Sequence, residues 1–127
     1  MAEQFLLFVY GLLMRERAGS RSLGLATRVR CLGPERVSGR LYHLGDYPGL
    51  VTAQRGLVHG QLVAFRDHSL FEKLDAYELF DPDDTEGSEY RRVEVDLLGS
   101  GRRAWAYEYN RPVRNRPIVR SGRWTGR

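Results

Sequence analysis

The sequence predicts an α+β domain: a small, closed or strongly curled β-sheet with few flanking helices. Three observations lead to this fold class. Short segments with the apolar patterns of strands dominate the chain, 14 glycines and 5 prolines favour many turns, and a single segment has a clear helical stripe. A length of 127 residues, 42% of them hydrophobic, suits one compact domain over residues 1–127.

The first half of the chain predicts three short strands. Residues 5–10 form a β-rich apolar run that ends at Gly11, as expected for a buried strand followed by a turn. Residues 14–30 are polar with scattered leucines and predict a loop with one poor helix. Residues 36–45 alternate apolar and polar side chains, and residues 47–54 begin as a turn and become strand-like.

The second half predicts a central strand and a hairpin. Residues 56–65 are apolar on both faces in places, which is typical of a strand in the middle of a sheet. Their alternation puts His59 and Gln61 on the same side. Residues 89–98 and 102–110 alternate on either side of a Gly-Ser-Gly turn and predict the hairpin.

The single clear helix is predicted over residues 68–78, with Asp67 as its N-cap. Its buried stripe recurs at spacings of one, three and three: Leu70, Phe71, Leu74 and Tyr77. Glu78 follows Leu74 by four residues, so it continues this apolar stripe into the last turn.

Glu78 is the candidate catalytic residue. A carboxyl on an apolar face is disfavoured in its charged form, and the negative end of a helix acts in the same direction, so both raise its pKa. A raised pKa makes Glu78 a candidate general base and acid near neutral pH. The helix alone leaves an alternative open, in which Glu78 is an exposed, frayed residue or the ion-pair partner of an arginine.

Charge is unevenly distributed along the chain. The net charge is +4, but residues 111–127 contain six arginines and no acid. The remainder has 14 basic and 16 acidic residues, a net charge of −2. The Arg-rich segment is either a basic arm that contacts phosphates or, as we favour, a solvated arm or a closing segment. Nucleic acid is therefore not an expected partner.

Common catalytic and cofactor motifs are absent from the sequence. The three histidines and one cysteine lack the spacing of a zinc site, and no nucleophile elbow, dinucleotide loop or Walker loop is present. Residues 81–92 fail as a calcium loop, because Glu86 stands where a glycine is needed and Arg92 where a chelating glutamate is needed. We therefore expect no metal and no cofactor, and an ordinary solvated loop at residues 81–89.

Nothing in the sequence indicates export or membrane attachment. No apolar run approaches the roughly 20 residues of a membrane span. Residues 5–13 lack the basic start and the cleavage site of a secretory signal. The single Cys31 allows no internal disulfide. A cytoplasmic protein is expected, and its oligomeric state stays open.

Seven segments, in this order, resemble the motifs of the gamma-glutamylcyclotransferase-like family, in its gamma-glutamylamine cyclotransferase or avirulence-induced-gene-like branch. No single segment is specific, whereas the ordered set covers nearly the whole chain. The segments are 8–13 (FVYGLL), 39–51 (GRLYHLGDYPGLV), 58–65 (VHGQLVAF), 74–78 (LDAYE), 89–95 (EYRRVEV), 104–109 (AWAYEY) and 118–124 (IVRSGRW).

The resemblance implies a small mixed β-barrel with few flanking helices, and an enzyme that releases 5-oxoproline from a gamma-glutamyl amine or gamma-glutamyl amino acid. The substrate's alpha-amine attacks its own gamma-carbonyl, so no serine or cysteine nucleophile is needed. The resemblance further implies that Glu78 is the general acid and base. The backbone N–H groups of Gly11, Leu12 and Leu13 are expected to bind the substrate carboxylate and the developing oxyanion.

Several aromatic and basic residues have two interpretations each. Tyr10 and Tyr90 are expected to line the substrate pocket, whereas Tyr107 is better explained as a core aromatic residue. Arg92 is expected either to bind a carboxylate or to pair with an acid on its own strand. Trp124 is better explained as a lid that packs on the barrel than as a ligand contact.

One departure from the family pattern bears on activity. Leu12 stands where the family has serine or threonine, so this position supplies an N–H group but no hydroxyl. The main alternative is therefore a catalytically silent family member that binds a small molecule or a partner protein. Two further alternatives are a nucleic-acid-binding barrel that uses residues 111–127, and removal of a gamma-glutamyl group from a biosynthetic intermediate. The leaving amine is not predicted.

Overall fold

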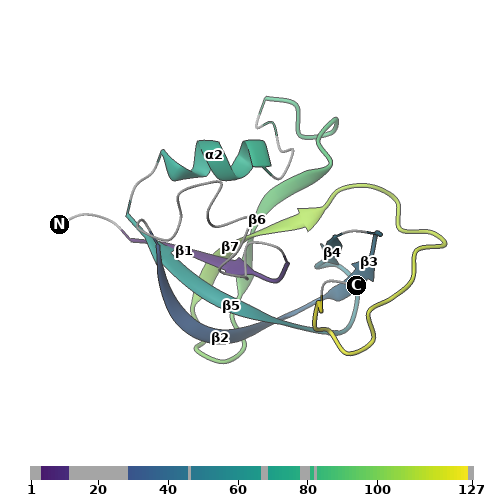
Figure 1. Ribbon diagram of the computed structural model, residues 1–127, viewed down its shortest axis with the longest axis horizontal. Helices are drawn as coiled ribbons and strands as arrows, with labels where there is room; N and C mark the ends of the chain where they lie inside the picture. Colours follow the sequence, from purple (N-terminus) through teal and green to yellow (C-terminus); the bar gives the residue numbers. More distant parts are fainter. Residues whose placement is uncertain are drawn as a thin grey trace.

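The structure, a computed structural model, describes residues 4–11, 29–45, 47–66, 69–77, 81 and 83–125. These residues form strands around a central β1, with one helix packed on the sheet (Figure 1), which confirms the α+β class. In chain order the elements are β1 (Phe5–Val9), β2 (Arg30–Ser38), β3 (Arg40–His43), β4 (Pro48–Val51), β5 (Leu57–Phe65), α2 (Leu70–Tyr77), β6 (Tyr90–Asp96) and β7 (Arg103–Tyr109).

The main sheet is mixed and has the strand order β2-β5-β1-β7-β6. β1 pairs antiparallel with β5 and parallel with β7, where Leu7 is the partner of Trp105. β5 is thus an inner strand, as its two-sided apolar pattern predicted, and β6 and β7 form the predicted hairpin. β3 and β4 form a separate antiparallel pair.

The closed barrel implied by the resemblance is not formed by the described strands, because β2 and β6 remain the two edges of an open but curled sheet. At one end, the turn that follows β6 reaches β2, where the N–H of Leu98 donates to the carbonyl of Arg36 at 3.0 Å. Beside it, the Glu35 carboxylate accepts the N–H groups of Gly99 and Ser100. Burial raises the pKa of Glu35, but these backbone donors outweigh it and leave the pKa lowered. These hydrogen bonds to β2 come from the β6–β7 turn and not from β6. The described strands β2 and β6 therefore form no hydrogen-bonded ladder, and the sheet is not closed.

The strand predicted over residues 36–45 is two strands that separate at Gly39. Gly39 has a φ of 155°, and its N–H donates to the carbonyl of Gly56 at 3.1 Å. A Cβ atom at Gly39 would lie 2.8 Å from Cδ1 of Leu50, so a glycine is needed for this bend. β2 also begins earlier than predicted, at Arg30. Most of the loop and helix predicted over residues 14–30 lies outside the described residues.

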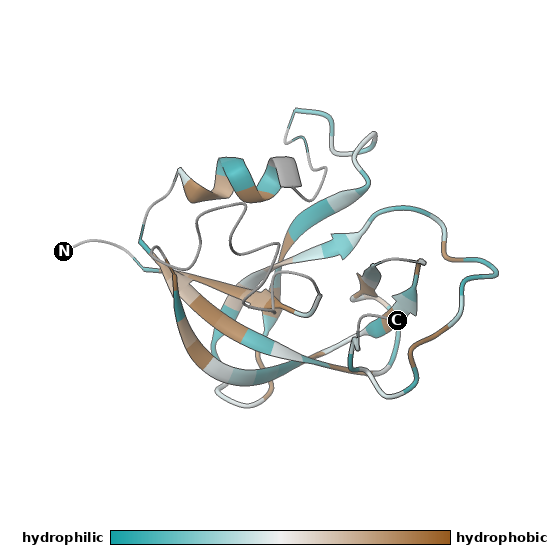
Figure 2. Ribbon diagram, in the orientation of Figure 1, coloured by the Kyte–Doolittle hydropathy of each residue, from teal (hydrophilic) through white to brown (hydrophobic). Residues whose placement is uncertain are grey.

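Helix α2 covers one face of the main sheet with the predicted apolar stripe. Leu70, Phe71 and Leu74 are almost fully buried, and the side of α2 that faces the sheet is its hydrophobic side (Figure 2). The predicted N-cap, Asp67, and Glu78 lie outside the described residues. Within the described chain, no helix is long and apolar enough to cross a membrane.

The Arg-rich C-terminal segment, as far as it is described, closes on the domain and does not extend from it as an arm (Figure 1). The N–H of His43 donates to the carbonyl of Pro117 at 2.8 Å, and the N–H of Val119 donates to the carbonyl of Leu41 at 2.7 Å. These bonds add the segment to the free edge of β3. Trp124 is 4% exposed and packs in the core, as expected for a residue that covers the sheet.

Candidate active site

Two segments of the predicted motifs meet where β1 ends. Tyr10 and Gly11 follow β1, and Tyr47 precedes the first residues of β4, Pro48 and Gly49. A Cβ atom at Gly11 would lie 2.9 Å from Cγ of Pro48. Gly11 therefore lies directly against the Tyr-Pro-Gly segment, and a glycine is needed for this close approach.

Tyr10 is a buried anchor at this meeting point. It is 6% exposed, and its hydroxyl donates to the carbonyl of Tyr107 at 2.5 Å. The same hydroxyl accepts the N–H of Leu50 at 3.2 Å. Through its hydroxyl, Tyr10 thus joins the end of β1 to backbone groups of β4 and β7, which fixes the position of the neighbouring Gly11.

Tyr90, which lies beneath α2, binds the Tyr-Pro-Gly segment. It is 5% exposed, belongs to the core cluster beneath α2, and donates its hydroxyl to the carbonyl of Pro48 at 2.6 Å. Its ring packs edge-on against Tyr109 with centroids 5.4 Å apart. The ring of Tyr47 lies 6.3 Å away. Tyr47, Tyr90 and Tyr109, from three segments, therefore form one aromatic group that is joined to Pro48 through the Tyr90 hydroxyl.

At the exposed rim of this group, the Tyr47 hydroxyl donates to Oε1 of Glu89 at 3.0 Å. This hydrogen bond, then burial and the negative charge of Glu89, raise the pKa of Tyr47 above the usual value of a tyrosine. The Tyr47 phenol therefore stays protonated at neutral pH and acts as a donor at the rim.

Helix α2 is fixed to the sheet by a buried carboxylate, Asp75. Its Oδ1 accepts the hydroxyl of Tyr107 at 2.5 Å and the Nη1 of Arg92 at 3.3 Å. The Arg92 guanidinium also stacks on rings beneath the helix, 4.1 Å from the centroid of Phe71 and 5.3 Å from that of Trp105. Arg92 therefore pairs with the helix and not with an acid of its own strand.

The contacts of α2 also give its direction over the sheet. Phe71, at the start of the helix, packs on Trp105, with ring centroids 6.3 Å apart. One turn later, Asp75 binds Tyr107, two residues further along β7. The next pair on this face of the hairpin is Tyr109 with Tyr90. α2 therefore runs towards Tyr90 and the end of β1.

Comparisons with known proteins show the family to which the chain belongs. The family model described as "Gamma-glutamyl cyclotransferase, AIG2-like" matches residues 7–126. The chain belongs to this family. It is 35% identical over 123 residues to the gamma-glutamylcyclotransferase family protein YtfP of Escherichia coli K12, a match that covers 95% of this chain and 96% of that protein.

Solved structures of family members share the fold. The solution structure of E. coli ytfP has a TM-score of 0.69 at 33% identity and covers 95% of this chain and 96% of that one. The crystal structure of an AIG2-like protein from Mus musculus has a TM-score of 0.70 at 18% identity, with 96% and 88% covered. The second similarity shows the fold alone.

Residues from four of the family motifs, the segments 8–13, 39–51, 89–95 and 104–109, meet near Pro48. They include three of the predicted site residues: Tyr10, Gly11 and Tyr90. The other three, Leu12, Leu13 and Glu78, lie outside the described residues, and their positions stay predictions.

The sequence analysis did not single out Asp75, the second residue of the motif segment 74–78 (LDAYE). The available signal was its spacing of four from Phe71, which puts it at the edge of the buried stripe. A second buried carboxylate, Glu108, was also missed. It accepts Nε of Arg91 at 2.6 Å and the N–H and hydroxyl of Thr52 at 3.1 and 2.6 Å. Glu108 is thus an anchor between β4 and the hairpin.

Proposed function

We propose that this protein is a gamma-glutamyl cyclotransferase that releases 5-oxoproline from a gamma-glutamyl amine or gamma-glutamyl amino acid. Membership of the family supports this proposal. The observation that carries it is the meeting of the Tyr-Gly turn, the Tyr-Pro-Gly segment and Tyr90 at the place towards which α2 runs. Glu78 directly follows Tyr77, the last residue of α2, in the sequence.

The proposed reaction is an intramolecular acyl transfer. The alpha-amine nitrogen of the substrate attacks its gamma-carbonyl carbon and closes a five-membered ring. The bond from that carbon to the leaving nitrogen breaks as the oxyanion collapses. Glu78 takes the proton that the attacking nitrogen loses and passes a proton to the leaving amine, so the reaction needs no net proton, water or cofactor.

The other roles follow from the described contacts. The N–H groups of Gly11, Leu12 and Leu13 bind the substrate carboxylate or the oxyanion, and Leu12 supplies a backbone donor only. Tyr10 and Tyr90 line the site with their rings, because their hydroxyls are engaged with backbone groups. Their contribution is to hold the anion-binding turn in place.

The decisive experiment compares Glu78→Gln with Glu72→Gln, the same change at an exposed position of α2. Release of 5-oxoproline is measured by chromatography with gamma-glutamyl amino acids, gamma-glutamyl amines, glutathione and gamma-glutamyl-lysine. We expect the wild type and Glu72→Gln to be active on the same substrate. Glu78→Gln should fold normally and lose about 10²- to 10⁴-fold in rate, as for a general acid–base residue. Full activity of Glu78→Gln would refute the assignment.

The pH–rate profile tests the burial of Glu78. A carboxyl on the apolar face is expected to have a pKa above the usual value of about 4.3. The acidic limb of kcat/KM should therefore lie well above pH 4.3. An acidic limb near the usual pKa of an exposed glutamate would contradict the burial of Glu78. The catalytic role of Glu78 would still be tested by the substitution experiment.

A catalytically silent family member is the second candidate, and Leu12 is the observation that favours it. Such a protein binds a gamma-glutamyl compound or a partner protein without turnover. Calorimetry on the same panel separates the two candidates: saturable binding without any 5-oxoproline would support the silent protein and reject the enzyme.

A further inference from the structure

A hollow of about 300 Å³ opens where the C-terminal segment crosses the start of β3 and β5. Three arginines from distant parts of the chain line it: Arg40, Arg55 and Arg120. The hollow lies at the end of the β3–β4 pair where Arg40 is the partner of Val51. The candidate active site is at the other end of this pair, at Pro48.

Hydrogen bonds between backbone groups join the segments that line the hollow. Val119, from the crossing segment, donates its N–H to the carbonyl of Leu41, and the N–H of His59 donates to the carbonyl of Gly122 at 2.8 Å. Gly122 has a φ of 70°, and a Cβ atom there would lie 1.9 Å from the carbonyl oxygen of Leu57. The contact between the C-terminal segment and the start of β5 therefore requires a glycine at position 122. The backbone around the hollow is thus held in place without a ligand.

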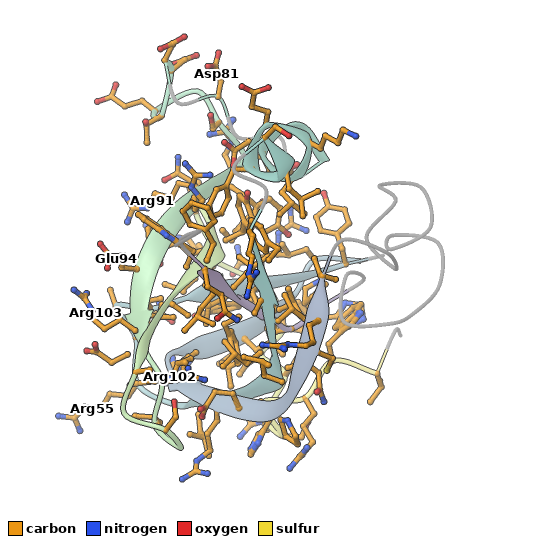
Figure 3. The ribbon with its side chains drawn as sticks, turned by 90° about the vertical axis from the view of Figure 1, so that its left-hand side faces the viewer. Arg55, Asp81, Arg91, Glu94, Arg102 and Arg103 are labelled. Atoms are coloured by element: carbon orange, nitrogen blue, oxygen red, sulfur yellow. The ribbon has the colours of Figure 1, made fainter. Side chains whose placement is uncertain are left out.

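The charge of the hollow is uncompensated. No acidic residue lines it, and within the described part of the chain none of its three arginines has an ion-pair partner. Three arginines of the β6–β7 hairpin differ, because Arg91, Arg92 and Arg103 pair with acids. In Figure 3, Arg55 projects from the end of the molecule opposite the acidic loop at Asp81. Three unpaired like charges around one hollow repel each other until an anion binds.

The hollow also has an apolar side. Leu57 is 43% exposed and Ile118 is 41% exposed, and both line it. Few other large apolar side chains of the described chain are as exposed. A ligand that covers them gains by removing apolar surface from water. The ligand should therefore carry an apolar or ring portion beside its anionic group.

We propose that this hollow is a second binding site, which takes a small organic phosphate. Guanidinium groups bind phosphate oxygens in pairs, and three of them around one hollow suit a phosphate or diphosphate group. Leu57 and Ile118 receive the ring or apolar portion. A volume of about 300 Å³ is at the lower end for small-molecule sites. The negative net charge outside residues 111–127 disfavours a long nucleic acid.

The experiment is a binding titration of the purified full chain with adenosine diphosphate, inorganic pyrophosphate and adenosine, followed by calorimetry. We expect adenosine diphosphate to bind more tightly than pyrophosphate, and adenosine not to bind. Arg40→Gln and Arg120→Gln should each weaken binding at least about tenfold, whereas Arg103→Gln, at an exposed arginine paired with acids, should not.

Three outcomes would overturn the proposal. The first is an absence of saturable binding of both phosphates at millimolar concentrations. The second is binding that Arg40→Gln and Arg120→Gln leave unchanged, which would put the anion at another site, such as the turn after β1. The third is tighter binding of a single-stranded oligonucleotide that increases with its length, which would assign the arginines to nucleic acid. Release of 5-oxoproline should be unchanged in Arg40→Gln and Arg120→Gln, because neither arginine belongs to the candidate active site. Measuring this release in both variants therefore tests the second site separately from the proposed enzyme activity.

Discussion

Replacing Asp75 by alanine removes the carboxylate that fixes α2 to the β6–β7 hairpin. Asp75 accepts hydrogen bonds from Arg92 and Tyr107, and its side chain is 10% exposed while that of Arg92 is 21% exposed. The alanine variant leaves the Arg92 guanidinium in a mostly buried place without the carboxylate. This is the situation in which a lost ion pair is most destabilising.

The expected loss follows from these contacts. Removing one partner of a buried ion pair costs about 3–5 kcal/mol. The rings of Phe71 and Trp105 still contact the Arg92 guanidinium, and part of Arg92 reaches water, so we expect the lower end, about 3 kcal/mol. A domain with a stability of roughly 5–15 kcal/mol would keep its fold but lose a large part of that stability.

The assay is equilibrium unfolding in urea, with Glu94→Ala as the matched control. Glu94 pairs with Arg103, but their side chains are 48% and 61% exposed, so this pair should contribute at most about 1 kcal/mol. The effect at Glu94 should also shrink with added salt, whereas that at Asp75 should persist. Equal losses of unfolding free energy in the two variants would refute the reasoning.

The isosteric variant Asp75→Asn separates stability from catalysis. Its amide oxygen still accepts the Tyr107 hydroxyl, so we expect a smaller loss of about 1–2 kcal/mol. Because α2 leads into Glu78, kcat should fall at a temperature where the variant is fully folded, with KM nearly unchanged. Unchanged kcat, together with an unchanged pH–rate profile, would make Asp75 a purely structural residue.

Two further predictions concern Tyr90 and His59. Tyr90→Phe removes the hydrogen bond to Pro48 and should cost about 1 kcal/mol in unfolding free energy while KM stays within a few-fold; a KM rise of a hundredfold would show instead that the hydroxyl binds substrate. Burial, and then the charges of two neighbouring arginines, lower the pKa of His59. The unfolded chain therefore binds more protons, and the free energy of unfolding should decrease as the pH falls below about 6.5. His59→Gln should flatten this part of the stability profile measured by urea unfolding, and an unchanged slope would contradict the assignment.

The sequence determined the local elements because their patterns depend on neighbours in the chain. The alternation in residues 56–65 predicted an inner strand, and the stripe from Leu70 to Leu74 predicted the buried face of α2. The ordered motifs were sufficient to predict the family, which the family match over residues 7–126 confirms. Helical spacing placed Glu78 on the apolar stripe, but it was the resemblance of the ordered motifs to the family that made Glu78 the predicted catalytic residue.

The closed barrel and the uninterrupted strand over residues 36–45 show where local patterns fail. Alternation is the same for a straight strand and for two strands separated by a bend, so it did not reveal the change of direction at Gly39. Closure depends on whether two edges far apart in the sequence can form a ladder. Among the described residues, the hydrogen bonds from the β6–β7 hairpin to β2 come from its turn, through Leu98, Gly99 and Ser100, and β2 and β6 form no ladder, so the sheet stays open.

Only the tertiary structure decided which residues of the motifs meet. Periodicity gives no sign that the residues at the end of β1 meet Pro48 and Tyr90, because Pro48 is 38 residues from Tyr10 and Tyr90 is 42 residues further along the chain. Asp75 looked like an ordinary helix carboxylate until packing brought Arg92 and Tyr107 to it. Periodicity reports which face of an element is buried. Which residues pack against that face depends on long-range pairing, and that pairing is set by the packing of the whole domain.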